Sequence, residues 1–142
     1  MTCDEHSLIA DVALFAGGKV LLVKYTDSNQ YDHQKGWFLP DAGIGPFEHP
    51  ERAAGRILDE QLGLAVPNIR LGNIESFKGN DGTWHLPFHY YAELDSVPRL
   101  KPSPDVEAVE WFDLWRLPPK ADVAHHGWAL TTIAQIRRTQ VP

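Results

Sequence analysis

Two carboxylates near the middle of the chain, with an arginine between them, have the types and spacing of a site for a divalent cation. Glu48 lies in a stretch rich in glycine and proline, and Arg56 and Glu60 follow in a segment with helical apolar spacing. A loop carboxylate that faces a helix carboxylate supplies the oxygen ligands that hard cations prefer. The alternative is that Glu48 only forms an ion pair with Arg56 and that Glu60 is an ordinary exposed helix acid.

A helix over Pro50 to Leu62 must position Glu60. Proline suits the first helical turn, where its missing N–H costs nothing, and Gly63 is a typical C-terminal stop. At about 100° per residue, Ala54, Leu58 and Leu62 line the face expected to pack on a sheet. Glu60 falls on the neighbouring face, so we expect it beside the core stripe and out of bulk water.

Apolar and β-branched runs predict the strands that support this helix. They cover Ser7–Phe15, Lys19–Tyr25, Ile69–Phe77, Pro87–Leu94 and Val106–Phe112, with a short apolar run at Trp37–Leu39 and a second helix at Gly127–Arg138. Gly17-Gly18 predicts a hairpin turn between the first two strands. Polar, glycine-rich or proline-rich composition predicts irregular structure over Thr26–Lys35, Asp41–His49 and Val97–Pro104. This order of elements favours an α/β sandwich with a mixed β-sheet between helices.

Composition limits the class of protein. The 142 residues, 43% of them hydrophobic, fit a single domain over 1–142, and Cys3 is the only cysteine, which favours a reducing cytoplasm. No apolar run is long enough for a signal peptide or a membrane span. The net charge of −6 argues against polymeric nucleic acid, which needs clustered basic residues. A single nucleotide or nucleotide-sugar remains an expected partner.

The central segment resembles a known catalytic motif. Gly36-Trp37-Phe38-Leu39-Pro40-Asp41-Ala42, followed by Glu48, Arg56, Glu60 and Gly63-Leu64, looks like the Nudix box, and Val106–Pro118 resembles the later Nudix strand that ends in a Trp and a Leu-Pro turn. The resemblance implies a Nudix-type α/β/α sandwich. It also implies hydrolysis of a nucleoside diphosphate linked to another moiety, with Mg²⁺ or Mn²⁺ as cofactor, and often a homodimer.

Four positions depart from the box. Asp41 and Ala42 replace two glycines, Ile57 stands where the glutamate after the arginine belongs, and Gln61 stands where the second of the paired glutamates belongs. Ile57 is expected to be a packing residue. The resemblance implies Glu60, Glu48 and Arg56 as the catalytic set. It implies that a metal would be held by Glu60, Glu48 and the backbone carbonyl of Ala42, with Gln61 or Asp105 as additional ligands.

Three aromatic or histidine side chains are candidates for substrate contact. His89 lies in a predicted strand near where substrates lie in this fold, and Trp84 and Tyr31 could stack on a base. The alternative for each is packing in the core or at the surface. His125 and His126 are expected near the start of a surface helix.

Two functions stay open from the sequence. The first is a metal-dependent Nudix hydrolase that is atypical or weak because two box glutamates are missing. The second is a catalytically inactive Nudix-fold module that binds a nucleotide or similar ligand. A weak resemblance to the GDP-mannose mannosyl hydrolase branch rests on Arg56-Ile57 and His89-Tyr90. Against it, that branch keeps the carboxylate at the position that Gln61 occupies here, and its catalytic histidine would fall near Val106.

Overall fold

A computed structural model describes residues 6–27, 34–79 and 81–140 of the chain. Two long helices, seven strands and one short 3-10 helix were assigned within these residues. In chain order they are β1 (His6–Ala16), β2 (Lys19–Tyr25), β3 (Asp41–Gly43), α1 (Pro50–Leu62), β4 (Arg70–Ile74), β5 (Phe77–Lys78), β6 (Trp84–Leu94), β7 (Val106–Asp113), η2 (Lys120–Asp122) and α2 (Ala124–Gln140). Neither long helix is both long and apolar enough to cross a membrane.

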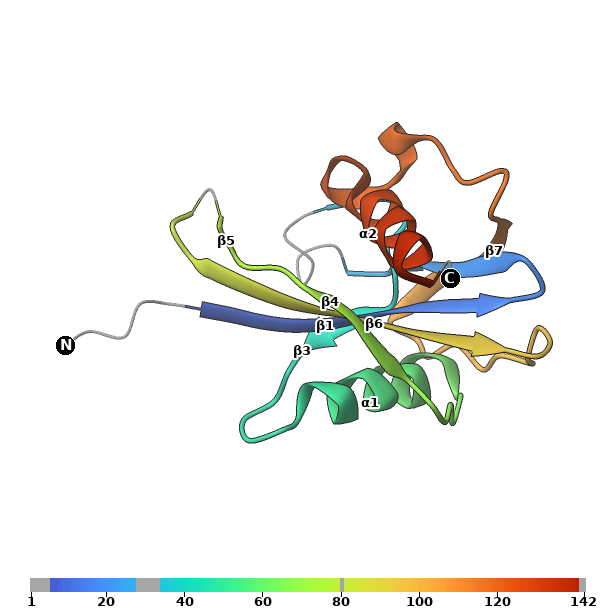
Figure 1. The fold of residues 1–142 in the computed structure, drawn as a ribbon, viewed down its shortest axis with the longest axis horizontal. Coiled ribbons are helices and arrows are strands. Elements are labelled where there is room, and N and C mark those ends of the chain that lie inside the picture. Colours follow the sequence, from blue (N-terminus) through green and yellow to red (C-terminus); the bar gives the residue numbers. More distant parts are fainter. Residues whose placement is uncertain (1–5, 28–33, 80, 141–142) are drawn as a thin grey trace.

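The strands form one mixed sheet with the order β4-β6-β1-β2-β7. Strand β1 pairs in parallel with β6 along its whole length and antiparallel with β2, while β3 pairs with the half of β1 that β2 leaves uncovered. The helices α1 and α2 cover opposite faces of this sheet (Figure 1). The predicted α/β/α sandwich with a mixed sheet between helices is therefore confirmed.

Alternation along β1 builds a core on each face of the sheet. Val12 and Leu14 face α1, where they pack in a cluster with Leu58 and Leu62. Ala13 and Phe15 face α2, in a second cluster that includes Ile133 and Ile136, among other residues. Because both faces of β1 are buried, any polar residue within this strand must find a partner inside the protein.

Helix α1 begins and ends at the predicted residues. The His49 side chain accepts a hydrogen bond from the Glu51 N–H at the N-terminus, which satisfies one donor that the helix leaves unpaired. At the other end, Gly63 adopts the left-handed conformation with φ 68°, and its N–H donates to the Asp59 carbonyl. These ends fix the position of every side chain that the box contributes from the helix.

Four predicted boundaries are wrong. A short strand, β3, forms within Asp41–His49, because β1 extends beyond β2 and offers an unpaired edge. The run Ile69–Phe77 contains β4 and β5, which are separate strands that both pair with β6. Strand β6 begins at Trp84, three residues before the predicted Pro87. Helix α2 begins at Ala124 and includes left-handed residues from His125 to Gly127, a turn that apolar periodicity does not reveal.

Candidate functional site

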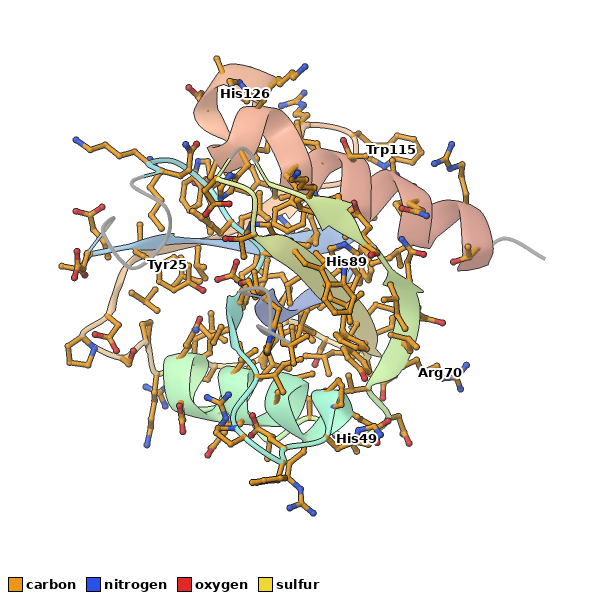
Figure 2. The ribbon with its side chains drawn as sticks, turned by 90° about the vertical axis from the view of Figure 1, so that its left-hand side faces the viewer. Tyr25, His49, Arg70, His89, Trp115 and His126 are labelled. Atoms are coloured by element: carbon orange, nitrogen blue, oxygen red, sulfur yellow. The ribbon has the colours of Figure 1, made fainter. Side chains whose placement is uncertain are left out.

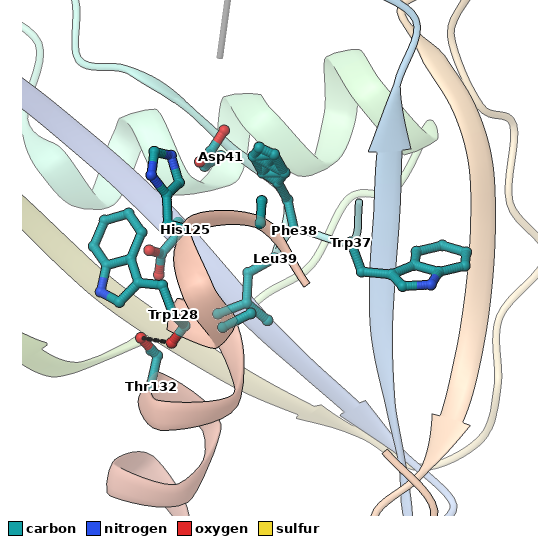
Figure 3. A pocket seen from close by; sticks show the side chains of 10 residues that line it. Trp37, Phe38, Leu39, Asp41, His125, Trp128 and Thr132 are labelled. Atoms are coloured by element: carbon teal, nitrogen blue, oxygen red, sulfur yellow. Dashed lines mark hydrogen bonds between the residues drawn. The ribbon is translucent and has the colours of Figure 1, made fainter. Parts of the chain in front are cut away.

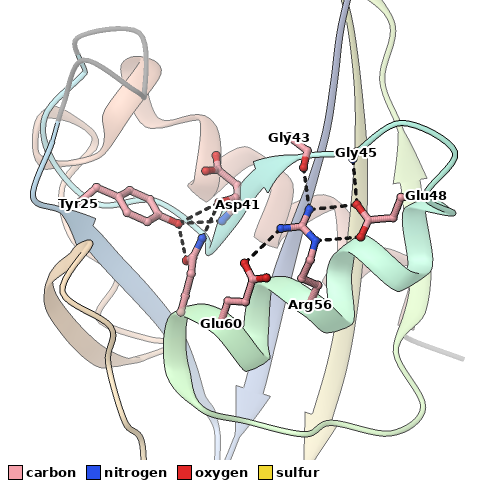
Figure 4. A network of polar contacts seen from close by, with 8 residues as sticks. Tyr25, Asp41, Gly43, Gly45, Glu48, Arg56 and Glu60 are labelled. Atoms are coloured by element: carbon pink, nitrogen blue, oxygen red, sulfur yellow. Dashed lines mark hydrogen bonds and ion pairs between the residues drawn. The ribbon is translucent and has the colours of Figure 1, made fainter.

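The loop between β3 and α1 is held by Arg56. Its guanidinium donates to both carboxylate oxygens of Glu48, at 2.8 and 3.0 Å, and to the Gly43 carbonyl at 2.9 Å. The Gly45 N–H donates to the same carboxylate at 2.9 Å. The hydrogen bonds from Arg56 and Gly45 lower the pKa of Glu48 to about 2. Figure 4 shows this arrangement, in which the Glu48 carboxylate is a fixed anchor of the loop.

Glu60 lies one turn further along α1 and points away from the core. Its side chain is 61% exposed, and one oxygen lies 3.4 Å from Arg56. The expectation that Glu60 lies beside the core stripe and out of bulk water is therefore wrong. The buried stripe is wider than Ala54, Leu58 and Leu62, but it extends toward Ala53, Ile57 and Gln61 and not toward Glu60.

Ile57 and Gln61, the two residues that replace box glutamates, are both buried. Ile57 is 1% exposed and packs in a small cluster with Ala10 and Ala53. Ala42, whose carbonyl was expected as a metal ligand, lies in β3 opposite Ala10 and packs partly against this cluster. The prediction that Ile57 is a packing residue is confirmed.

Gln61 uses both ends of its amide in hydrogen bonds. Its Nε2 donates to the Asp41 carbonyl at 2.8 Å, and its Oε1 accepts from the Tyr25 hydroxyl at 2.8 Å. The Asp41 N–H in turn donates to the Tyr25 hydroxyl at 2.9 Å. Tyr25, the Asp41 backbone and Gln61 thus form a hydrogen-bond network that ties β2, the start of β3 and α1 together (Figure 4).

These residues do not fit a divalent cation well. Cations such as Mg²⁺ take several anionic or carbonyl oxygens in near-octahedral geometry. Both Glu48 oxygens already accept hydrogen bonds, the Gln61 oxygen accepts from Tyr25, and Ile57 has no donor atom to offer. Only Glu60 presents an exposed carboxylate on this helix face. Within the described part of the chain, no three His, Cys, Asp or Glu side chains gather closely enough to hold a metal ion.

A narrow pocket lies on the α2 side of the same loop (Figure 3). Its cavity volume is about 20 Å³, and Asp11 and Asp41 give it two carboxylates. The remaining lining is mostly aromatic or apolar, and it consists of Trp37, Phe38, Leu39, Ala124, His125, Trp128, Ala129 and Thr132. Asp41 therefore belongs both to the pocket, by its place in the lining, and to the hydrogen-bond network with Gln61.

Beside the pocket, a buried histidine connects two acids. The His89 Nδ1 lies 2.8 and 2.9 Å from the two Asp11 oxygens, and its Nε2 lies 2.7 Å from Glu75. Burial lowers the pKa of His89, but the hydrogen bonds and charges of Asp11 and Glu75 outweigh it and raise the pKa above its usual value. Burial also raises the pKa of Asp11, against the opposing effect of His89. Asp11, His89 and Glu75 are thus connected by hydrogen bonds, an arrangement that no sequence motif predicts.

The candidate substrate contacts lie in different places. His89 is completely buried and lies inside the body of the molecule (Figure 2). Trp84 is 48% exposed, and its indole N–H donates to Ser76 at 2.8 Å. Tyr31 lies outside the described residues. The backbone of His125 and His126 is left-handed, with φ of 55° and 58°, and only His125 lines the pocket.

Sequence reasoning missed Asp11, Glu75 and Trp128. The signal for Asp11 was available, because it interrupts the apolar run Ser7–Phe15 and a charged residue inside a buried strand is rarely tolerated without a partner. Its partner, His89, is 78 residues away in the sequence. Only the parallel pairing of β1 with β6, which places Asp11 opposite His89, brings them together.

Comparison with known proteins identifies a family to which the chain is similar. The family model described as NUDIX domain matches residues 6–131. No curated protein matches the chain.

Several solved structures share its fold. A MutT NUDIX hydrolase from Burkholderia pseudomallei has a TM-score of 0.77 at 24% identity, covering 93% of this chain and 98% of that one. The NUDIX domain of Shewanella oneidensis NrtR, solved with ADP ribose, has a TM-score of 0.78 at 23% identity, covering 98% and 91%. A C. elegans Ap4A hydrolase binary complex has a TM-score of 0.66 at 16% identity, covering 94% and 98%.

Proposed function

Because the chain belongs to the NUDIX domain family, we propose that it binds a nucleotide or nucleotide-linked diphosphate without efficient metal-dependent hydrolysis. The observation that supports this proposal most strongly is the hydrogen bonding of the Gln61 side chain. Its amide occupies the position of a box glutamate, and both ends of the amide are committed to Tyr25 and Asp41. Of the helix positions at which the box has glutamates, only Glu60 therefore keeps a carboxylate, where catalysis in this family uses several.

Support for ligand binding comes from the pocket. It lies between the sheet and α2, combines aromatic lining with buried polar groups, and adjoins the box loop through Asp41. Concave, mostly apolar sites with a few polar groups are the usual form of small-molecule sites, and this one, with a cavity volume of about 20 Å³, would have to widen to take a nucleotide. The Shewanella oneidensis NUDIX domain was solved with ADP ribose, and we propose a ligand of the same general class, a nucleotide or nucleotide-sugar, for this chain.

A second candidate is a slow hydrolase of a nucleoside diphosphate linked to another moiety. One observation favours it: Glu60 is exposed and bound only weakly to Arg56, so its carboxylate is accessible to solvent and to a cation. Hydrolases are also among the proteins that share the fold. In this candidate Glu60 is the metal ligand, Arg56 and Glu48 keep the loop in shape, and Mg²⁺ or Mn²⁺ is required.

A combined binding and hydrolysis screen distinguishes the binding function from the slow hydrolase. The pure chain is tested against ADP-ribose, GDP-mannose and diadenosine tetraphosphate, with Mg²⁺, with Mn²⁺ and with EDTA. We expect saturable binding of at least one compound in EDTA and no turnover above the rate of the Glu60→Gln variant. Metal-dependent turnover that Glu60→Gln abolishes would instead establish the hydrolase.

A further inference from the structure

We propose that the outer edge of β4 is the surface by which two copies of this chain form a symmetric dimer, with the two β4 strands paired antiparallel. The contact involves the side chains from Arg70 to Glu75 and neither the box nor the interior of the pocket. The proposal goes beyond ligand binding and does not depend on it.

Strand β4 lies at one end of the sheet, and no other strand among the described residues covers its outer edge. The backbone groups of such an edge can pair with another chain. Two large apolar side chains on this strand are about half exposed, Leu71 at 49% and Ile74 at 46%. At the opposite end of the sheet, β7 carries the exposed acids Glu107, Glu110 and Asp113, and like charges oppose self-pairing of an edge. Of these two edges, β4 is therefore the one that suits a second copy.

A bulge in β4 places Leu71 and Ile74 on the same face of the sheet. Residues three apart in a regular strand point to opposite faces. In β4, however, the register with β6 shifts between Leu71 and Asn73. Leu71 lies opposite Tyr90, and Ile74 lies opposite the residue two positions before Tyr90 on β6. Since opposed residues share a face and Tyr90 packs in the core cluster of α1, both apolar side chains lie on the α1 face.

The sequence of β4 is complementary to a second copy of itself. A two-fold axis between Gly72 and Asn73 sets Leu71 opposite Ile74 of the second copy. The same register sets Arg70 opposite Glu75 of the second copy, on the other face of the sheet. Each of these contacts occurs twice in an isologous pair. Opposed apolar side chains and opposed unlike charges both stabilise antiparallel strands.

Glu75 can accept this contact while it keeps its own partners. Its Oε1 lies 2.7 Å from His89 Nε2 and accepts from the Trp128 indole N–H at 3.3 Å. The side chain is 32% exposed, so its second oxygen is open to a cation. Arg70 is exposed and points away from the body of the molecule (Figure 2). In the dimer, the arginine of one copy joins the hydrogen-bonded group that leads from Glu75 through His89 to Asp11 of the other.

Sedimentation equilibrium of the full chain, up to about 200 μM, tests for the dimer. Six residues a side make a small interface, so we expect weak association, with an average mass that rises with concentration from one chain toward two. Ile74→Lys should weaken association by about 10-fold or more, because it places a charge in the apolar contact twice. Val97→Lys, at a residue that is 47% exposed between β6 and β7, is the matched control and should associate as the wild type does.

Disulfide crosslinking tests the register. In a Cys3→Ser background, chains with Leu71→Cys and chains with Ile74→Cys are mixed and oxidised. The mixture should give a covalent dimer, because opposed positions in an antiparallel pair lie within the reach of a disulfide. Either variant alone should give much less, because position 71 of one copy lies about 10 Å along the strand from position 71 of the other.

A wild type that stays monomeric at every concentration would overturn the inference, leave the edge to a strand of a different protein, and leave the proposed ligand binding intact. Association that survives Ile74→Lys would overturn it as well, since the contact would then lie elsewhere. Equal crosslinking by either cysteine variant alone would exclude the register. If Ile74→Lys does not fold, Arg70→Glu takes its place, and it should weaken association because it sets two acids against each other.

Discussion

At the scale of single residues, the Gln61 amide forms hydrogen bonds at a position where the box has a glutamate. The Gln61 Nε2 lies 2.8 Å from the Asp41 carbonyl, a contact that needs a donor on the side chain. A glutamate in this place would set a carboxylate oxygen against a carbonyl oxygen in a buried site, which is unfavourable unless a cation lies between them. The amide thus does with a hydrogen bond what a metal ion would do with coordination.

Gln61→Glu should therefore create a need for a cation. In EDTA we expect the variant to lose about 1–3 kcal/mol of unfolding free energy, because a buried donor is replaced by a charged acceptor. Addition of Mg²⁺ or Mn²⁺ should restore part of that loss. The measurement is urea unfolding with and without cation.

The matched control for Gln61→Glu is Glu60→Gln. Because Glu60 is exposed, this change should alter the free energy of unfolding by less than about 0.5 kcal/mol under either condition. Gln61→Glu that is as stable as the wild type in EDTA would show that the amide network is dispensable.

Glu48 makes the loop sensitive to acid. Its pKa of about 2 in the folded chain lies below the value of an unfolded glutamate, so its stabilising effect is complete above about pH 4.5. It is lost as the pH falls toward 2. Glu48→Gln should therefore cost about 1–2 kcal/mol at pH 7, and the difference from the wild type should shrink below pH 4.5.

The pH series for Glu48→Gln is followed by urea unfolding at pH 7, 4.5 and 2.5. Asp113→Asn serves as the control, because the Lys19–Asp113 pair is exposed and contributes little at any pH. A cost of Glu48→Gln that stays constant from pH 7 to pH 2.5 would contradict the ion pair described here.

At the scale of elements, two segments far apart in the sequence form one wall of the pocket. The Trp37 N–H donates to the Asp122 carbonyl at 2.9 Å, and the Ala124 N–H donates to the Trp37 carbonyl at 3.0 Å. Gly36 permits this approach, since its φ is 109° and an added Cβ would lie 2.6 Å from the Asp122 carbonyl oxygen. The start of α2 is thus held against the segment that leads into β3.

Gly36→Ala should push these two segments apart. We expect a loss of about 2–4 kcal/mol in unfolding free energy, from backbone strain together with a clash against another backbone. Ligand affinity should fall as well. Gly82→Ala is the control, because Gly82 also has a positive φ, 84°, but an added Cβ would meet nothing within 4 Å. Thermal unfolding of both variants is the measurement. Equal losses of stability in Gly36→Ala and Gly82→Ala would mean that the close approach at Gly36 does not stabilise the fold.

The sequence predicts most of the elements because their signals are local. Helix α1 begins with Pro50 and ends before Gly63, as read from the residues alone, and Gly17-Gly18 marks the hairpin turn. Strand β3 was not predicted, because it exists only where β1 offers an unpaired edge. The left-handed turn at His125-His126 was missed for a similar reason, since neither residue favours that conformation without tertiary contacts.

Of the candidate site, only the residues that belong to the Nudix box could be predicted from the sequence. The positions of Glu48, Arg56 and Glu60 on the loop and the helix came from spacing, but the degree of exposure of Glu60 did not. Helical periodicity gives a direction around the axis and not the width of the buried stripe, which the neighbouring strands set. Asp11 and His89 could not be paired from the sequence, because the register of two strands distant in the chain decides their contact.

At the scale of the whole molecule, the sandwich places the box network and the pocket on either side of one segment. The strand β3 and the residues before it run between α1 and α2, and Asp41 belongs to both arrangements. Asp41 is thus a residue that the box network and the pocket lining share. The single domain over 1–142 and a homodimer stay predictions of the sequence, which size-exclusion chromatography with light scattering can check.

The net charge of −6 bears on partners of the whole chain. Binding to a nucleic-acid backbone requires clustered basic groups that displace counterions. We expect no change in fluorescence anisotropy when the chain is added to labelled single-stranded DNA or RNA of about 20 nucleotides at low salt. Saturable binding that weakens steeply with added salt would contradict this expectation.

We infer that hydrogen bonds, and not a divalent cation, hold the box loop against α1. Titration of the full chain with Mn²⁺, followed by the electron paramagnetic resonance signal of the free ion, tests it most directly. We predict that the wild type binds no Mn²⁺ in a saturable way and that Gln61→Glu gains a site that Glu60→Gln removes. Saturable binding of Mn²⁺ by the wild type, lost in Glu60→Gln, would contradict the claim.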